Sequence, residues 1–282
     1  MKALAEHDPL LEGMYWIQDA GACCGVYALD QGRTLIDAGN MYGLTDELLD
    51  LGPLDRLQRV LLTHSHFDHV GGLAEIYQLA SPVLYAHPLT REYLRLLRPP
   101  FPDFFDALER DGKLQLIEDG TVLDGNPPLQ VLHLPGHTAG DLAFFDPRSG
   151  ALFSGDAVLA NRTRYGAALS KPDEVSGGRL QDKVTSLRRL LALPVKHLFA
   201  GHGDPLFDKG ADQIKISLAT LYREQDKDRP ERAWLAMGRD LMALGQSGDA
   251  EQCARKALEL APNDPEATQF LSALAEPPHP AG

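Results

Sequence analysis

The segment from Thr63 to His69 reads T-H-S-H-F-D-H and places three imidazoles and one carboxylate within a few residues. A carboxylate is almost never buried unpaired, so a shared cation best explains this density on a loop that follows an apolar strand. His64 and His66 alternate along an extended segment and therefore point the same way. Asp68 lies with His69 on the turn into a helix, and both can bind a metal ion at a second, neighbouring position. One loop can thus supply ligands to two neighbouring metal ions.

Three later segments each end a predicted strand with one metal-ligating side chain beside a glycine. They are G-H-T at His137, G-D at Asp156 and G-H-G at His202. Imidazole nitrogen and carboxylate oxygen suit zinc, iron or manganese. The absence of cysteine from these segments argues against a closed structural zinc site and for a centre with an open, reactive position. We therefore expect two divalent cations, with zinc preferred over iron or manganese.

In order and character, the pattern H-x-H-x-D-H, G-H-T, G-D and G-H-G resembles the metallo-β-lactamase superfamily over about residues 10–210. The resemblance implies an α/β (α+β) fold, a four-layer αββα sandwich with the metals at one edge. It also implies a ligand for each position: a first metal on His64, His66 and His137, a second on Asp68, His69 and His202, and Asp156 bridging both.

The resemblance implies roles for three further residues. Asp37 matches the acidic position near the site and would orient a ligand histidine, although an aspartate before Gly39 can also simply form a turn. His133 would add a supporting hydrogen bond. Tyr165 would donate to a developing oxyanion, as a tyrosine does in lactonase relatives, with an ordinary loop tyrosine as the alternative.

The implied function is a glyoxalase-II-like metallohydrolase that cleaves a thioester, ester or lactone of a small molecule. A water shared by two cations loses its proton near neutral pH, and the hydroxide is the nucleophile. Asp68 would steer this nucleophile or pass a proton to the leaving group. The basic cluster that binds glutathione in that family is not recognisable here.

Three alternatives remain. An iron persulfide dioxygenase has a similar motif but uses one metal held by two histidines and an aspartate. A phosphodiesterase also suits two metals. In the third alternative, a partner-binding or signalling protein acts through its C-terminal helices.

Alternating apolar residues and turn signals predict the elements that carry these loops. We expect strands at 25–29, 34–36, 60–62, 83–85, 129–134, 142–145, 151–153 and 197–200, and helices at 70–79, 180–191 and 212–223. Cys23 and Cys24 are expected to be small strand residues. The proline-interrupted segment 87–112 is either a lid or a loop whose aromatic side chains cover the core.

The pattern becomes entirely helical near residue 225, which predicts a catalytic domain at 1–225 and a helical extension at 226–282. Trp234, Gly238, Ala250, Ala257 and Pro262 fall at the offsets of one tetratricopeptide repeat. Helices are expected at 231–244 and 249–260, with a third that begins at Pro265. One repeat cannot bury its own apolar face, so these helices should pack on the catalytic domain, form a homodimer or bind a protein partner.

The composition limits the partners. The 282 residues include 27 basic and 40 acidic side chains, a formal charge of −13, which disfavours nucleic acid and anionic membrane surfaces and leaves a small-molecule substrate. Apolar runs are too short to span a membrane. Three cysteines, two of them adjacent, do not form a disulfide framework, which favours the cytoplasm.

Overall fold

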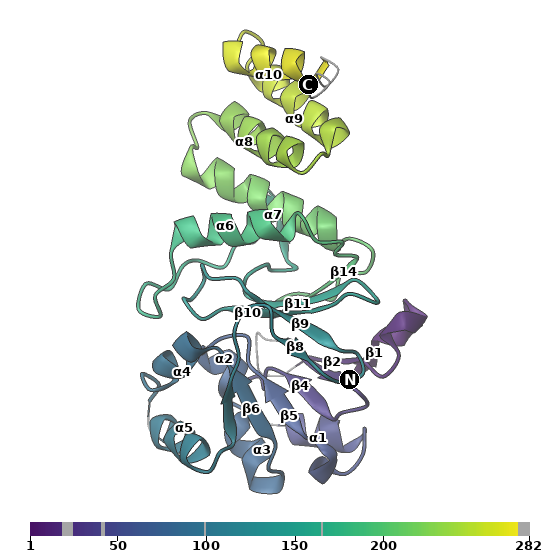
Figure 1. The fold of residues 1–282 in the computed structure, drawn as a ribbon, viewed down its shortest axis with the longest axis vertical. Helices are drawn as coiled ribbons and strands as arrows, with labels where there is room; N and C mark the ends of the chain where they lie inside the picture. Colours follow the sequence, from purple (N-terminus) through teal and green to yellow (C-terminus); the bar gives the residue numbers. More distant parts are fainter. Residues whose placement is uncertain (19–24, 41–42, 99, 165, 276–282) are drawn as a thin grey trace, which may run out of the picture.

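Two β-sheets stack between helical layers in the computed structural model, which describes residues 1–18, 25–40, 43–98, 100–164 and 166–275 (Figure 1). The larger sheet contains, in spatial order, β1 (Lys2–Ala3), β2 (Tyr15–Gln18), β3 (Gly25–Leu29), β4 (Thr34–Ile36), β5 (Arg59–Leu61), β6 (Val83–Ala86) and β7 (Leu114–Leu116). Strands β1 to β4 pair antiparallel, and β4 to β7 pair parallel.

The second sheet contains β14 (His197–Ala200), β11 (Ala151–Gly155), β10 (Leu142–Asp146), β9 (Leu129–His133) and β8 (Val122–Leu123). Strand β14 pairs parallel with β11, and the other pairs are antiparallel. A separate ribbon joins β12 (Arg162–Thr163) to β13 (Gly166–Ala167). Short 3-10 turns lie at Leu4–Glu6, Pro9–Leu11 and Leu54–Arg56.

Strand β3 illustrates why both sheets are buried on both faces. Its side chains alternate between two apolar clusters: Val26 and Ala28 face the outer helices, whereas Tyr27 and Leu29 face the second sheet. The phenol of Tyr27 also donates a hydrogen bond to the carbonyl of Ala200 across the sandwich. The continuous apolar runs in the sequence are therefore strands that face a helical layer on one side and a sheet on the other.

Helices cover both outer faces. The larger sheet packs against α1 (Leu44–Leu49), α2 (Phe67–Val70), α3 (Leu73–Leu79), α4 (Pro88–Leu94) and α5 (Phe101–Arg110), and the smaller against α6 (Leu180–Leu190) and α7 (Gly210–Gln225). The expected four-layer αββα sandwich is confirmed (Figure 1). Phe105 is buried, and Phe101 and Phe104 pack on the same apolar cluster, so the aromatic residues of segment 87–112 cover the core.

The predicted helix at 70–79 is wrong in one respect, because the structure divides it into α2 and α3 at Gly71 and Gly72. A Cβ on Gly72 would lie 2.1 Å from the carbonyl oxygen of Ala38, so the chain after β4 passes too close for a side chain there. The sequence pattern did not predict β1, β2, β7, β8, β12, β13 or α1. Cys23 and Cys24 lie outside the described residues.

Three further helices, α8 (Pro230–Ala243), α9 (Ser247–Leu260) and α10 (Pro265–Ala275), extend away from the sandwich beyond α7 (Figure 1). They share one apolar cluster with α6, α7 and the smaller sheet. Trp234 is partly buried against this cluster. The extension thus packs on the sandwich, one of the arrangements expected from the sequence. None of the described helices is both long and apolar enough to cross a bilayer.

Gly238 allows α8 to approach α9 and α10. A Cβ there would lie 2.7 Å from the ring of Phe270 and 3.2 Å from Cβ of Cys253. We expect Gly238→Ala to lower the free energy of unfolding by about 1–3 kcal/mol because the packed helices must separate. The matched control is Gly248→Ala in α9, where an added Cβ meets nothing within 4 Å. There the free energy should stay the same or rise by up to about 1 kcal/mol. Equal urea-unfolding midpoints for the two variants would contradict this packing.

Candidate metal centre

The loops that follow four strands bring all seven predicted ligands together. His64 and His66 follow β5, Asp68 and His69 lie in α2, His137 lies between β9 and β10, Asp156 follows β11, and His202 follows β14. Three groups hold their ligand atoms within 4.8 Å of one another: His64, His66 and His137; His64, His69 and Asp156; and Asp68, His69 and His202. The first and third groups are the two sets that the resemblance implied.

Asp156 lies between these two sets. Its Oδ1 is 3.5 Å from Nε2 of His69, and its Oδ2 is 3.5 Å from Nε2 of His137. The same Oδ2 is 3.4 Å from Nε2 of His202. One carboxylate therefore faces ligands of both sets, which is the geometry expected of a bridging group.

Glycines before these ligands permit the close approach. Gly155 has φ +49°, and a Cβ there would lie 2.5 Å from the side chain of Thr63. A Cβ on Gly201 would lie 2.5 Å from Oδ1 of Asp156. Because any side chain would occupy the space between the strand ends, glycine in the G-D and G-H-G segments is a steric requirement.

The donor atoms fit divalent cations. Nε2 of His64 and Oδ1 of Asp156 are buried and form no hydrogen bond with any described residue. Buried polar atoms normally have a partner, and a bound ion is one explanation for those that have none. Nδ1 of His66 lies 2.9 Å from Nε2 of His137, so two ring nitrogens face each other at the same place. Nitrogen and oxygen donors without sulfur suit zinc, iron or manganese.

Burial and charge divide the histidines into two kinds. Burial lowers the pKa of His64 well below its usual value and that of His137 to about 4, so both rings are neutral at pH 7. Hydrogen bonds to Asp156 and Asp68 raise the pKa of His202 to about 10. In the metal-free protein, the protonated His202 ring therefore balances part of the carboxylate charge.

Asp37 positions His69. It is buried with φ +59°, and its Oδ2 accepts a hydrogen bond of 2.7 Å from Nδ1 of His69. Thr63 holds the carboxylate in turn, because its backbone N–H and its hydroxyl each donate to Asp37 at 2.8 Å. The proton is thereby kept on Nδ1, and Nε2 of His69 faces Asp156. Asp37 thus makes the contact expected of an orienting residue.

Several side chains hold the loop that carries His137. His133 donates from Nε2 to the carbonyl of Ala139 at 2.8 Å, and its ring stacks on that of His87. Asp141, which the sequence analysis missed, accepts hydrogen bonds of 2.8 Å from the backbone N–H of His137 and of Thr138. Burial raises the pKa of Asp141 to about 6.

Two other contributions were also missed. Lys183 is buried in α6 and donates to the hydroxyl of Ser170, which in turn donates to the backbone carbonyl of Asp156. Asp173 accepts a hydrogen bond of 2.9 Å from Nε2 of His66. No local spacing marks either residue, because each contact depends on how distant segments pack. Tyr165 lies outside the described residues, so its role stays a prediction.

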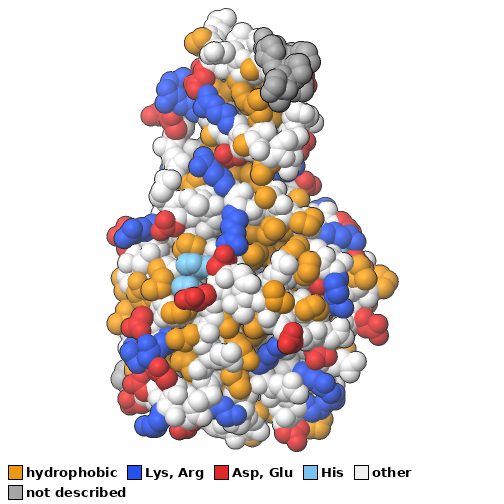
Figure 2. All heavy atoms as spheres, viewed as in Figure 1, with side chains coloured by type: hydrophobic (Ala, Val, Ile, Leu, Met, Phe, Trp, Pro, Cys, Tyr) orange, Lys and Arg blue, Asp and Glu red, His pale blue; other side chains and the backbone are white. Residues whose placement is uncertain are grey.

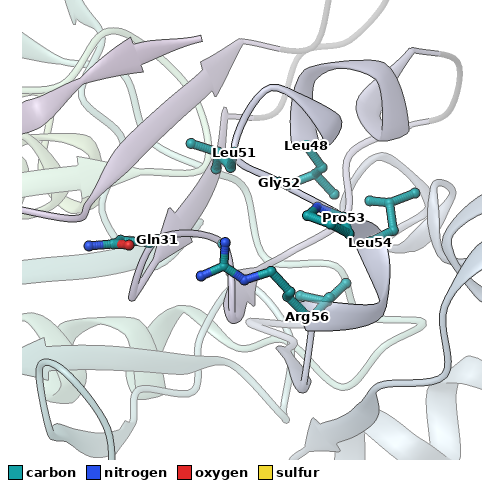
Figure 3. A pocket seen from close by; sticks show the side chains of 9 residues that line it. Gln31, Leu48, Leu51, Gly52, Pro53, Leu54 and Arg56 are labelled. Carbon is teal, nitrogen blue, oxygen red and sulfur yellow. The ribbon is translucent and has the colours of Figure 1, made fainter.

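A hollow next to α1 offers no competing site. It lies between Gln31, Leu51 and Arg56, where Figure 3 shows mainly apolar side chains. Its volume is about 10 Å³, room for about one water molecule. Its lining contains no histidine, cysteine or carboxylate.

Comparison with known families agrees with this geometry. The sequence model of the metallo-beta-lactamase superfamily matches residues 22–202, and a tetratricopeptide repeat model matches residues 231–274. The acyl-coenzyme A thioesterase MBLAC2 of Homo sapiens is 29% identical over 251 residues, covering 77% of this chain and 86% of the relative. The hydroxyacylglutathione hydrolase of Ruegeria pomeroyi is 29% identical over 216 residues, 73% of each chain.

Solved structures have the same fold. The metallo-beta-lactamase family protein TTHA1429 from Thermus thermophilus superposes with a TM-score of 0.56 at 21% identity, covering 94% of this chain and 92% of that one. TTHA1623, solved in a di-iron-bound form, has a TM-score of 0.50 at 31% identity and covers 68% of this chain and 94% of that one.

We expect zinc to stabilise the metal-free protein, because a cation that binds only the folded state shifts the unfolding equilibrium. At a free zinc concentration of 100 times Kd, the gain is about 3 kcal/mol per site. Asp156→Asn should remove most of this gain, since its carboxylate faces both ligand sets. Asp103→Asn, at an exposed carboxylate in α5, is the control and should respond as the unaltered protein does. Urea unfolding with and without zinc measures the difference, and an equal gain in the Asp156 variant would contradict the assignment.

Proposed function

Because the chain belongs to the metallo-β-lactamase superfamily, we propose that it is a metallohydrolase that cleaves small-molecule acyl thioesters at a dinuclear centre. The observation that carries the proposal is the convergence of two ligand sets on the single carboxylate of Asp156. Relatives named for acyl-coenzyme A and hydroxyacylglutathione, both of them thioesters, support the choice of substrate class.

In this proposal, one set would hold each cation. The first comprises His64, His66 and His137, the second comprises Asp68, His69 and His202, and Asp156 is shared. Divalent cations bound there would act as Lewis acids toward water and toward the substrate carbonyl. We propose zinc, since hydrolysis needs no redox change, with iron or manganese as the alternatives.

Asp68 is our candidate for moving the proton. Its side chain is 32% exposed, and its Oδ2 lies 3.4 Å from Nε2 of His202. Burial acts to raise the pKa of Asp68, but the hydrogen bond with His202 and the nearby imidazole of His69 outweigh it, so the carboxyl is ionised at neutral pH. An ionised oxygen at the edge of the centre can accept a proton from the attacking water.

A thioester suits such a site. A thiol has a pKa of about 8.5, so the thiolate leaves as a stable anion and needs little help from an acid. An alkoxide leaving group needs a proton donor. Ionised Asp68 cannot provide one until it has taken a proton from water. Leaving-group chemistry therefore supports the choice of a thioester over an ester or lactone.

The alternatives differ in metal content and surface charge. A persulfide dioxygenase would use one iron, whereas two complete ligand sets support two ions. For a phosphodiesterase acting on nucleic acid, the charge of −13 is unfavourable. Acidic and basic side chains are interspersed on the face in Figure 2, without a basic stripe.

We assign the chemistry to residues 1–225, and packing or dimerisation to residues 226–282. Cysteine usage favours the cytoplasm.

The test compares a panel of substrates: an acyl-coenzyme A, an acyl-glutathione, the matching oxygen ester and a phosphodiester. We expect thiol release from a thioester to be fastest. Asp68→Ala should lower kcat/KM by about 10²- to 10⁴-fold because a proton acceptor and a ligand are both lost. Asp103→Asn is again the control.

Metal content is measured on the same samples. One iron per chain with oxygen uptake would instead favour the dioxygenase. Full thioesterase activity in the Asp68 variant would contradict the proposed role of this carboxylate.

A further inference from the structure

The segment 171–178, between β13 and α6, contacts two ligands of the same set. Nδ1 of His137 donates to the carbonyl of Lys171 at 2.6 Å. The backbone N–H of Asp173 donates to the carbonyl of His137 at 2.7 Å. The carboxylate of Asp173 accepts the 2.9 Å hydrogen bond from Nε2 of His66. One short segment therefore contacts both histidines that complete the first set with His64.

These contacts determine which ring nitrogen of His66 and of His137 is free to bind a cation. An imidazole that donates from one nitrogen presents the lone pair of the other. Asp173 keeps the proton of His66 on Nε2, so Nδ1 faces the centre, 2.9 Å from Nε2 of His137. The carbonyl of Lys171 does the same for His137 by holding its Nδ1 proton. Both lone pairs then point to one place.

The carboxylate of Asp173 is itself held by its own segment. The hydroxyl of Ser176 donates to Oδ2 at 2.6 Å, and the backbone N–H of Val175 donates to Oδ1 at 3.1 Å. The backbone N–H of Gly178 donates a hydrogen bond of 2.7 Å to the carbonyl of Asp173, which joins the two ends of this loop. The position of the oxygen that faces His66 is thus defined by three local hydrogen bonds as well as by the histidine.

We propose that Asp173 is a positioning residue for the first cation, the counterpart of Asp37 at the second. This inference rests on the proposed dinuclear centre. Asp37 orients His69, which belongs to the set with Asp68 and His202. Asp173 orients His66, which belongs to the set with His64 and His137. Each set therefore has its own orienting carboxylate, and loss of one should weaken one position rather than both.

The experiment measures zinc binding to the metal-free full chain by calorimetry in two backgrounds. In His202→Ala, the first position remains, and Asp173→Ala should weaken zinc binding about 10- to 100-fold. In His137→Ala, the second position remains, and Asp173→Ala should leave its Kd unchanged. Asp173→Asn keeps a hydrogen-bond acceptor for Nε2 of His66 and should recover part of the affinity in the first background.

Two controls separate positioning from damage to the loop. Glu174→Gln removes the adjacent, exposed carboxylate and should change neither Kd. Ser176→Ala removes one bond to Asp173 but leaves the contact with His66, so its loss should be smaller than that of Asp173→Ala. Nitrogen-15 NMR of the metal-free protein should show the His66 proton on Nε2, and a mixture of tautomers in Asp173→Ala.

The outcomes are distinguishable. If the unaltered chain binds no zinc, the proposed function fails together with this inference. If it binds two ions and Asp173→Ala changes neither Kd, or changes both equally, only the assignment of Asp173 is overturned. An unchanged His66 tautomer in Asp173→Ala would also overturn it.

Discussion

The structure depends on a buried carboxylate surrounded by histidines. Asp156 sits where loops from both sheets meet, and Nε2 atoms of three imidazoles lie within 3.5 Å of its oxygens. Burial acts to raise the pKa of Asp156, but the hydrogen bond with His202 and the nearby imidazole of His69 keep it well below the usual value. A buried negative charge needs compensation. In the metal-free protein part of this compensation comes from His202, and Nε2 of His64 and Oδ1 of Asp156 are buried donor atoms that cations would use.

The chemistry of this centre could be predicted from the sequence, because its ligands are dense along the chain. The segment 64–69 supplies four of them, and the others each follow an apolar strand beside a glycine. The strands that carry them were also predictable, since both of their faces are buried. What could not be predicted depends on tertiary contacts. Asp173 is 107 residues from His66, and its position in the fold follows from the course of a loop with no periodic pattern. The break between α2 and α3 likewise depends on the carbonyl of Ala38, in the chain that follows β4.

The helical extension follows a related physical rule. A single tetratricopeptide-like repeat leaves one apolar face uncovered. Here α7 covers it, because this helix contributes to one apolar cluster with the smaller sheet and with α8. Arg188 of α6 reinforces the junction by donating to Asp240 of α8 at 3.1 Å. The boundary that we propose near residue 225 therefore separates two sequence patterns, while the apolar core continues across it.

The two orienting carboxylates, Asp37 and Asp173, differ in burial and in the part of the fold that supports them. Asp37 is 1% exposed. It accepts a hydrogen bond from the backbone N–H of Thr63, two residues after the end of β5. A change there disturbs the sandwich itself. Asp173 has a side chain that is 31% exposed and is held by a loop between β13 and α6. Its carboxylate is supported by Ser176 and Val175 of the same loop rather than by a strand of either sheet. One of the two carboxylates therefore belongs to the buried core, and the other belongs to a partly exposed loop beside it.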